Sequence, residues 1–181
     1  MRAPIIIDCA PHQVFLTGGA GVGKSFLLCQ IVSKLPSATT FVTASTGIAA
    51  CQISGVTIHH WAGLGGTERP LPDLIEQARR KRGALWRAAT CLIIDEVSML
   101  DGDLFDSLES IARAVRADPR PFGGLQLVLV GDFFQLPPVT KRGPSATPLK
   151  FAFEARAWPL CVQRVHQLTQ VFRQVMASEY S

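Results

Sequence analysis

The chain has 181 residues, of which 48% are hydrophobic and 18% charged; this length and composition fit one globular domain and exclude a disordered region. Its formal net charge of +4 permits an anionic partner without identifying one. Gly, Pro or charged residues interrupt every hydrophobic stretch well before the roughly 18 to 20 residues that span a bilayer, so we expect no membrane partner.

We interpret residues 1–12 as an N-terminal extension and residues 13–181 as the domain. The opening sequence, MRAPIIIDCAPHQ, has one Arg and only three consecutive large apolar residues, too few for a secretory signal or a transit peptide. The cysteines stand singly, without the paired spacing of a metal site, so we expect them to be small buried residues in an intracellular, reducing compartment. They are Cys9, Cys29, Cys51, Cys91 and Cys161.

Short apolar runs at residues 14–17, 40–43, 91–95 and 126–131 alternate with helical patterns. Continuous apolar runs are typical of strands that are buried on both faces. Their alternation with helices predicts an α/β fold, in which a parallel sheet carries helices on both faces.

Two helices and two loops are predicted around these strands. The first helix begins near Lys24, where Phe26, Leu27, Ile31 and Leu35 recur at helical spacing, and Pro36 ends it. The second covers residues 101–117, with acidic residues at its start and basic residues at its end. Its apolar stripe consists of Leu104, Phe105, Leu108, Ile111, Ala112 and Val115. Residues 62–72 and 137–148 are rich in Gly and Pro and predict loops.

The segment GGAGVGKS satisfies the pattern GxxxxGK[ST] and lies directly between a predicted strand and a predicted helix. Its glycines let successive N–H groups converge on phosphate oxygens at the positive end of the helix. Lys24 would reach the terminal phosphates of ATP, and Ser25 would bind Mg²⁺. The alternative is a Gly-rich turn that binds nothing. The predicted nucleotide-binding residues are Gly18, Gly19, Ala20, Gly21, Val22, Gly23, Lys24 and Ser25.

An apolar strand ends in the adjacent carboxylates Asp95 and Glu96. Because ligands bind at the carboxyl ends of parallel strands, this pair should face the phosphates. Asp95 suits the hold on Mg²⁺, and Glu96 is then free to deprotonate the attacking water. The alternative is a pair of acids that cap the helix at 101–117.

The fourth predicted strand is followed by Asp132 and Gln135 in the segment VGDFFQLPP. Gln135 can hydrogen-bond the γ-phosphate or the water, and Asp132 can support the metal site. A turn residue exposed ahead of Pro137 is an equally good interpretation of Gln135.

The series GGAGVGKS, TASTGIAA, GVTIHHWAGLG, LIIDEVSML, VLVGDFFQLPPV and LTQVFRQ resembles the successive motifs of the petite integration frequency (PIF) helicases of superfamily one. RecD-type helicases share much of the series. The stretch EVSMLDGDLFDSLESIARAVR, residues 96–116, favours the PIF family. The resemblance covers about residues 12–175.

This resemblance implies a RecA-like P-loop domain of an ATP-dependent 5′-to-3′ DNA helicase that acts in repair, recombination and telomere maintenance. The implied partners are single-stranded, forked and G-quadruplex DNA, and we expect a monomer. For a eukaryotic protein the implied location is the nucleus, the mitochondrion or both. Mg²⁺ is the implied cofactor and ATP the substrate.

The same resemblance assigns roles to individual residues. Gln135 becomes the γ-phosphate sensor, beside Lys24, Asp95 and Glu96 as catalytic residues. Arg173 matches an arginine that reaches the γ-phosphate, where a positive charge accelerates hydrolysis by roughly 10³- to 10⁵-fold in phosphoryl-transfer enzymes. A solvated arginine at the start of a helix is the alternative.

By the same resemblance, residues 43–49 and 57–61 match the segments that hold single-stranded DNA. Small hydroxylated residues can offer N–H and O–H donors to backbone phosphates. The candidate DNA contacts are Thr43, Ser45, Thr46, Gly47, Thr57 and His59. For His59 a local loop contact, and for Trp61 a core position, remain equal alternatives to stacking on a base. The basic cluster at residues 79–82 is either a further DNA contact or a solvated helix end.

Two departures from the family pattern limit these expectations. The opening residues show no clear counterpart of the adenine-reading glutamine segment, because Gln13 is close but misplaced. The sequence also contains no second RecA-like domain, so we expect the isolated chain to bind nucleotide weakly and to unwind nothing measurable. Alternative functions are a nucleotide-dependent interaction module or inactive truncated helicase, and an AAA-type ATPase.

Overall fold

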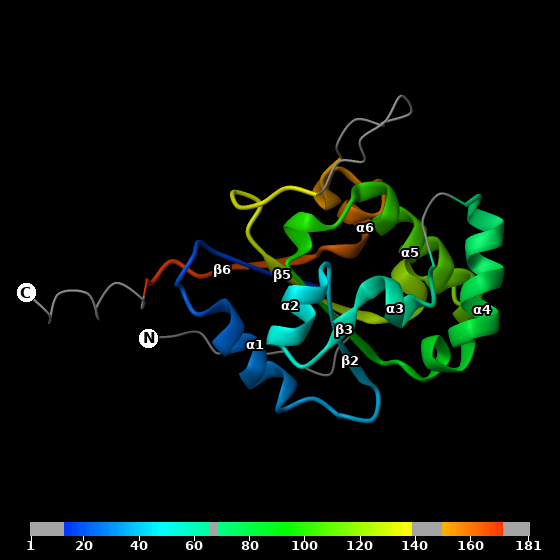
Figure 1. Cartoon of the computed structure of the whole chain (residues 1–181), viewed down its shortest axis with the longest axis horizontal. Helices are drawn as coiled ribbons and strands as arrows, with labels where there is room; N and C mark the ends of the chain where they lie inside the picture. Colours follow the sequence, from blue (N-terminus) through cyan, green and yellow to red (C-terminus); the bar gives the residue numbers. More distant parts are fainter. Residues whose placement is uncertain (1–12, 66–68, 139–149, 172–181) are drawn as a thin grey trace, which may run out of the picture.

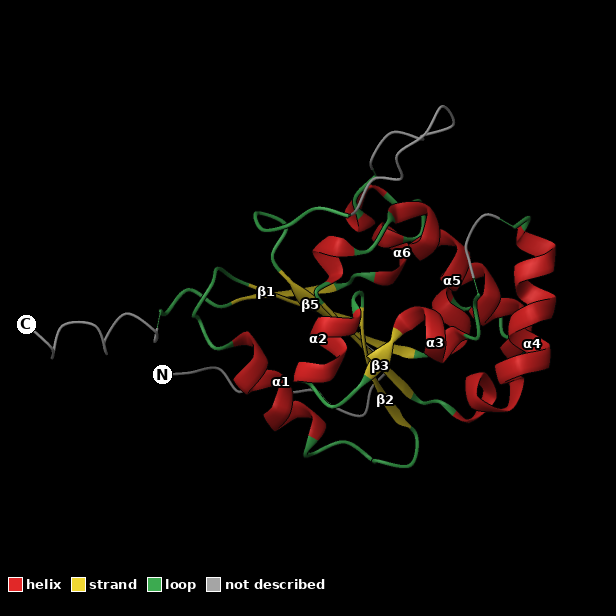
Figure 2. Ribbon diagram, viewed as in Figure 1, coloured by secondary structure: helices red, strands yellow, loops and turns green. Residues whose placement is uncertain are grey.

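The computed structural model describes residues 13–65, 69–138 and 150–171. Its strands form one parallel sheet, in the order β3-β2-β4-β5-β1-β6, which crosses the middle of the molecule (Figure 2). The strands are β1 (Val14–Thr17), β2 (Thr40–Ala44), β3 (Val56–Thr57), β4 (Cys91–Asp95), β5 (Gln126–Gly131) and β6 (Arg164–Gln167). The predicted α/β fold is confirmed.

Helices connect these strands. They are α1 (Lys24–Val32), α2 (Gly47–Gln52), α3 (Ile58–Ala62), α4 (Leu71–Ala88), α5 (Gly102–Arg116) and α6 (Trp158–Cys161). Short 3-10 turns lie at η1 (Val97–Met99), η2 (Pro121–Gly124) and η3 (Ala152–Glu154). None of the helices in the described ranges is long and apolar enough to cross a membrane.

The two faces of the sheet pack against different helices. In β4, Leu92 and Ile94 join the larger core with α3, α4 and α5, whereas Cys91 and Ile93 join the smaller core with Leu28 of α1 and other residues. Side chains alternate between faces along a strand, so a continuous apolar run fills both cores. Figure 1 shows α1 at one side of the sheet and α4 and α5 at the other.

The helix predicted at 101–117 is confirmed as α5, with all of its predicted stripe buried. The Asp101 side chain accepts hydrogen bonds from the N–H groups of Asp103 and Leu104 and so caps the helix. Asp101 thus fills the capping role that the alternative interpretation gave to Asp95 and Glu96.

The first helix is confirmed, and its predicted apolar stripe is wrong only at Phe26, because Leu27, Ile31 and Leu35 all pack in the smaller core. Leu28 and Ile31 are the buried residues of α1, and Leu27 packs beside them. Phe26 points away from this core and is 72% exposed. Helical spacing alone placed Phe26 on the core face of α1, but the face that packs against the sheet carries Leu28 and Ile31.

The cysteine prediction is only partly right. Cys91 and Cys161 are buried, and burial raises the pKa of each thiol to about 12. Cys29 and Cys51 are exposed, because they lie on the outer sides of α1 and α2. Cys9 lies outside the described residues.

The parallel register brings the carboxyl ends of neighbouring strands to one edge of the sheet. Ala44 of β2 lies opposite Asp95 of β4, and Thr17 of β1 lies opposite Gly131 of β5. The segments that leave these strands carry most of the residues that the sequence singles out.

Candidate active site

The phosphate-binding pattern forms a loop between Thr17 of β1 and Lys24 of α1. Gly21 and Gly23 have positive φ angles of 76° and 86°, a conformation that favours glycine. A side chain at Gly18 would place its Cβ 2.5 Å from the carbonyl oxygen of Leu168, so the close approach of the chain after β6 also requires glycine there.

The N-terminus of α1 opens into this loop. Gly23 is its N-cap residue, and no side chain caps the helix. The first N–H groups of a helix have no partner within it, so an anion at this place would be stabilised by N–H donors and by the helix dipole. The loop therefore has the geometry that phosphate oxygens require.

Lys24 holds its ammonium group inside the curve of the loop. Its Nζ donates to the carbonyl oxygens of Gly18 at 2.7 Å and Gly19 at 3.0 Å. Ser25, the next residue of α1, is exposed. Lys24 and Ser25 are thus the first two residues of α1, directly after the loop.

Asp95 is the last residue of β4, and its side chain is buried. Its Oδ1 accepts a hydrogen bond from the N–H of Glu96 at 2.9 Å, and its carbonyl oxygen accepts one from the N–H of Ser45 at 3.1 Å. Burial raises the pKa of the Asp95 carboxyl, while the N–H of Glu96 and the charge of Lys24 act in the opposite direction.

Glu96 follows in the left-handed conformation, with φ 52° and ψ 46°. This conformation is unfavourable for a residue with a side chain, and such strain is common at functional sites. The pKa of Glu96 is raised by burial first and then by the charges of Asp95 and Asp132, and Lys24 opposes the increase. Lys24, Asp95 and Asp132 therefore lie near enough to Glu96 to affect the ionisation of its carboxyl.

Gln135 is tied to Asp132 in a turn directly after β5. The Gln135 side chain donates from Nε2 to Oδ2 of Asp132 at 2.8 Å, and its backbone N–H donates to the Asp132 carbonyl oxygen at 2.9 Å. Gln135 is exposed and Asp132 is buried. The residue is therefore a turn residue whose amide lies beside the acidic site, and its role as phosphate sensor stays a prediction.

Gly131 is a site residue that sequence reasoning did not single out. A Cβ at Gly131 would lie 3.0 Å from the backbone nitrogen of Val97, so glycine lets the end of β5 pack directly on the turn after Glu96. The small residue before Asp132 was the available signal. Because Gly131 has no side chain, the turn after β4, which carries Glu96, lies close to the turn after β5, which carries Asp132.

Among the predicted DNA contacts, the segments after β2 and β3 each begin a short helix. The Thr46 hydroxyl accepts a hydrogen bond from the N–H of Ala49 at 3.2 Å and caps α2, and the Thr57 hydroxyl accepts one from the N–H of His60 at 3.3 Å and caps α3. Gly47 is exposed, and Ser45 is partly exposed. These residues lie at the carboxyl ends of β2, which pairs with β4, and of β3, which pairs with β2, on the same edge of the sheet as the phosphate loop.

The side chain of Thr43 does not belong to this group, which corrects its assignment as a DNA contact. Thr43 is fully buried, and its hydroxyl donates to the carbonyl oxygen of Ile93 at 2.7 Å. Inside β2, this hydroxyl therefore links β2 to β4 within the sheet.

The structure decides between the two interpretations of Trp61. The ring is 2% exposed and lies 4.4 Å from that of Trp86, so Trp61 is a core residue. His59 is partly buried, which lowers the pKa of its ring and favours the neutral form. A neutral His59 would offer DNA a hydrogen bond without a full positive charge.

The basic cluster at residues 79–82 lies in the middle of α4, not at a helix end. The guanidinium of Arg82 lies 3.0 Å from Nε2 of His60 on α3. Gln13 is buried against β5, with its amide bonded to backbone groups of Leu125 and Leu127. Arg173 lies outside the described residues.

Comparison with known proteins places this geometry in a family. A family model described as PIF1-like helicase matches residues 4–181. The Homo sapiens protein named ATP-dependent DNA helicase PIF1 is 48% identical over 166 residues, which are 90% of this chain and 25% of that protein. The Saccharomyces cerevisiae protein named ATP-dependent DNA helicase RRM3 is 47% identical over 168 residues, which are 90% of this chain and 23% of that protein.

Solved structures agree with this. The Pif1 helicase from Candida albicans has a TM-score of 0.85 and 45% identity, over 91% of this chain and 38% of that one. Pif1 from Bacteroides, in complex with ADP-AlF3 and single-stranded DNA, has a TM-score of 0.74 and 32% identity, over 95% and 41%. This chain spans about a quarter of the length of the curated relatives it matches. The chain belongs to the PIF1-like helicase family.

Proposed function

We propose that this chain is the ATP-binding and ATP-hydrolysing motor domain of a 5′-to-3′ DNA helicase. One observation carries the proposal: the phosphate loop, the acidic pair and the Asp132–Gln135 turn lie on the same sheet edge as the segments after β2 and β3. Relatives that are named ATP-dependent DNA helicases, and a relative solved with ADP-AlF3 and single-stranded DNA, support it.

The phosphate chain of ATP would lie in the loop, with its oxygens on the N–H groups at the start of α1. Lys24 would exchange its bonds to the Gly18 and Gly19 carbonyls for bonds to the terminal phosphates, because a charged acceptor makes a stronger hydrogen bond than a carbonyl. The loop thus positions the reacting phosphorus before any chemistry occurs.

Mg²⁺ fits this site as a partner of the nucleotide. Across the described residues no group of three or more His, Cys, Asp or Glu could hold a metal by itself. Ser25 Oγ and the Asp95 carboxylate would supply two oxygens, and Mg²⁺ typically takes its remaining ligands from phosphates and water. When bound, it would neutralise negative charge that develops on the phosphates.

Glu96 is the proposed general base. The pKa of Glu96 is raised toward neutral pH, which suits proton transfer. The charge of Lys24 opposes this increase and favours the ionised carboxylate. Gln135 is close enough to the acids to orient the water when its amide leaves Asp132. Arg173 remains the proposed source of positive charge at the γ-phosphate.

The segment proposed to bind DNA and the acid proposed to bind Mg²⁺ are hydrogen-bonded to each other, which offers a path for coupling. Ser45 donates from both its N–H, at 3.1 Å, and its hydroxyl, at 3.4 Å, to the carbonyl oxygen of Asp95. Phosphates of single-stranded DNA that bind at Ser45, Thr46, Gly47 and Thr57 would therefore bias the position of Asp95. We also propose forked and G-quadruplex DNA as substrates, a monomer as the working state, and the nucleus or mitochondrion as the location.

The test is ATP hydrolysis with and without single-stranded DNA, measured on this chain and on a longer clone. We expect DNA-stimulated turnover in the longer clone that is lost in Lys24→Ala, because the phosphates lose their cation. Turnover that DNA does not change, or that survives Lys24→Ala, would contradict the proposal. Thr90→Ala, an exposed substitution remote from the loop, is the control.

A further inference from the structure

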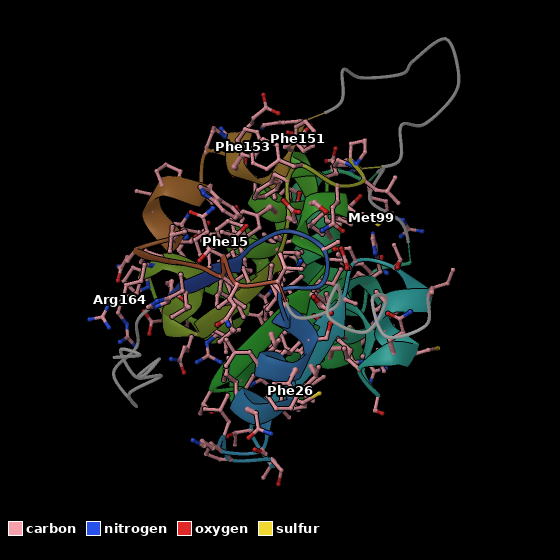
Figure 3. All side chains as sticks on the ribbon, turned by 90° about the vertical axis from the view of Figure 1, so that its left-hand side faces the viewer. Phe15, Phe26, Met99, Phe151, Phe153 and Arg164 are labelled. Atoms are coloured by element: carbon pink, nitrogen blue, oxygen red, sulfur yellow. The ribbon has the colours of Figure 1, made fainter. Side chains whose placement is uncertain are left out.

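A buried hydroxyl group without a hydrogen-bond partner lies next to the acidic site. Ser98 is the second residue of the turn η1 that follows Glu96, and it is fully buried. Its Oγ has no hydrogen-bond partner among the residues that the structure describes. Met99, the next residue, marks this turn in Figure 3. A buried polar group without a partner is costly and rare in folded proteins, so the hydroxyl of Ser98 points to a function.

Ser98 packs against the end of the strand that leads to Asp132. A Cβ at Gly131 would lie 3.0 Å from the backbone nitrogen of Val97 and 3.3 Å from that of Ser98, so η1 and the end of β5 are in close contact. Asp132 directly follows Gly131 and is itself buried. The Ser98 hydroxyl is therefore an unused donor in the neighbourhood of a buried carboxylate.

Both carboxylate oxygens of Asp132 already have a donor. Oδ1 accepts a hydrogen bond from the N–H of Phe134 at 3.1 Å, and Oδ2 accepts one from Nε2 of Gln135 at 2.8 Å. The proposed hydrolysis requires the amide of Gln135 to leave Asp132 and orient the attacking water. That step removes a donor from a buried charged group, which is unfavourable unless another donor replaces it.

We propose that Ser98 is a positioning residue for Gln135, whose hydroxyl turns to donate to Oδ2 of Asp132 when the Gln135 amide leaves. A serine side chain has three staggered rotamers, so rotation about one bond is enough to redirect its donor. The exchange keeps a donor on each oxygen of Asp132 and frees Gln135 for the γ-phosphate or the water. This inference rests on the proposed function and deepens it, because it names the residue that governs the release of Gln135.

The first test is urea unfolding of the 181-residue chain in a double-mutant cycle. In the unsubstituted chain, Ser98→Ala should raise the unfolding midpoint, because it removes a buried hydroxyl without a partner. In Gln135→Ala, Asp132 has lost its Oδ2 donor and Ser98 should take that place, so adding Ser98→Ala should lower the midpoint. Thr40→Val, which removes another buried hydroxyl without a partner at the start of β2, is the matched control and should raise the midpoint in both backgrounds.

The second test is steady-state ATP hydrolysis by the longer clone with single-stranded DNA. Ser98→Ala should lower kcat by about 10- to 100-fold, the effect of one hydrogen bond to a charged group. The KM for ATP should stay unchanged, because the phosphate loop is intact. Thr40→Val should retain the kcat and KM of the unsubstituted protein.

The outcomes separate this inference from the proposed function. A midpoint shift of the same sign for Ser98→Ala in both backgrounds would overturn the exchange at Asp132, and so would an unchanged kcat. Hydrolysis that survives Lys24→Ala would contradict the proposed function and, with it, the role of Ser98 in hydrolysis. The unfolding cycle needs no nucleotide, so it would still decide whether the Ser98 hydroxyl replaces Gln135 at Asp132.

Discussion

The carboxyl groups of Asp95 and Glu96 are held where burial disfavours their charge. Each has a raised pKa, with burial as the largest cause. A group whose pKa is higher in the folded state than in the unfolded state favours folding when protonated, and that contribution is lost as pH rises through the folded pKa. At neutral pH the buried charges of Asp95 and Glu96 therefore lower the stability of the fold.

We predict that Asp95→Asn stabilises the fold at pH 7 while it abolishes hydrolysis. The amide is neutral, keeps an oxygen for the N–H of Glu96, and removes the desolvated charge. Urea unfolding at pH 7 should show a higher midpoint, and the gain should vanish at acidic pH, where Asp95 is protonated. A lower midpoint at pH 7 would refute this, and Asp73→Asn, at an exposed acid, is the control.

A second prediction concerns the acid limb of activity. Asp132 raises the pKa of Glu96 through its charge, so Asp132→Asn should lower that pKa and keep the base ionised at lower pH. In the pH profile of kcat/KM for ATP hydrolysis by the longer clone, the acid limb should move to lower pH. An unmoved or upward-shifted limb would count against Glu96 as the base; the Asp73→Asn profile should match the parent.

At the residue scale, the sequence predicts those parts of the candidate site in which a short motif directly follows an apolar strand. The phosphate loop and the Asp95–Glu96 pair are set by local sequence next to apolar strands, and the structure brings them together. Thr43 could not be assigned in this way, since its partner, the Ile93 carbonyl, is 50 positions away in the chain. The raised pKa of Glu96 likewise depends on Asp132, which only the register of the sheet brings close.

The elements that the sequence revealed are those with large, regularly spaced apolar residues. Four strands and two helices were predicted on that basis and are present. Helix α2 was missed because it is short and its buried residues, Ala49 and Ala50, are small, and β3 was missed because it has two residues, neither of them buried. Helix α4 was missed although Leu74, Ala78 and Trp86 are buried, because its charged residues dilute the pattern.

Helix α4 is joined to α5 by Arg116. This guanidinium donates to the carbonyl oxygens of Ala89 and Trp86, just beyond and within the end of α4, and to that of Gly123 in the turn before β5. One side chain therefore satisfies backbone acceptors from two segments and fixes them on α5.

We predict that Arg116→Leu destabilises the domain by about 2 to 3 kcal/mol, because partly buried carbonyl oxygens lose a charged donor. Urea unfolding measures the change. The same substitution at Arg80, an exposed residue of α4, should change stability by less than about 0.5 kcal/mol. Equal effects at both positions would show that Arg116 does not hold these elements together.

At the scale of the whole molecule, one edge of the sheet brings two ligands together. Strands β1, β4 and β5 end in the predicted nucleotide site, and β2 and β3 end in the predicted DNA segments (Figure 1). The contact from Ser45 to Asp95 joins the two halves of this edge. Binding at one half should therefore change affinity at the other, and linkage requires the effect to be reciprocal.

The most direct test is the affinity of the longer clone for a fluorescent single-stranded oligothymidylate, measured by anisotropy with and without Mg-ADP-AlF3. We predict that the nucleotide analogue changes the dissociation constant by about 5- to 150-fold, the usual range of coupling between sites, and that Lys24→Ala abolishes the change. An identical dissociation constant with and without the analogue, under conditions where the analogue is shown to bind, would contradict a shared edge that couples ATP to DNA.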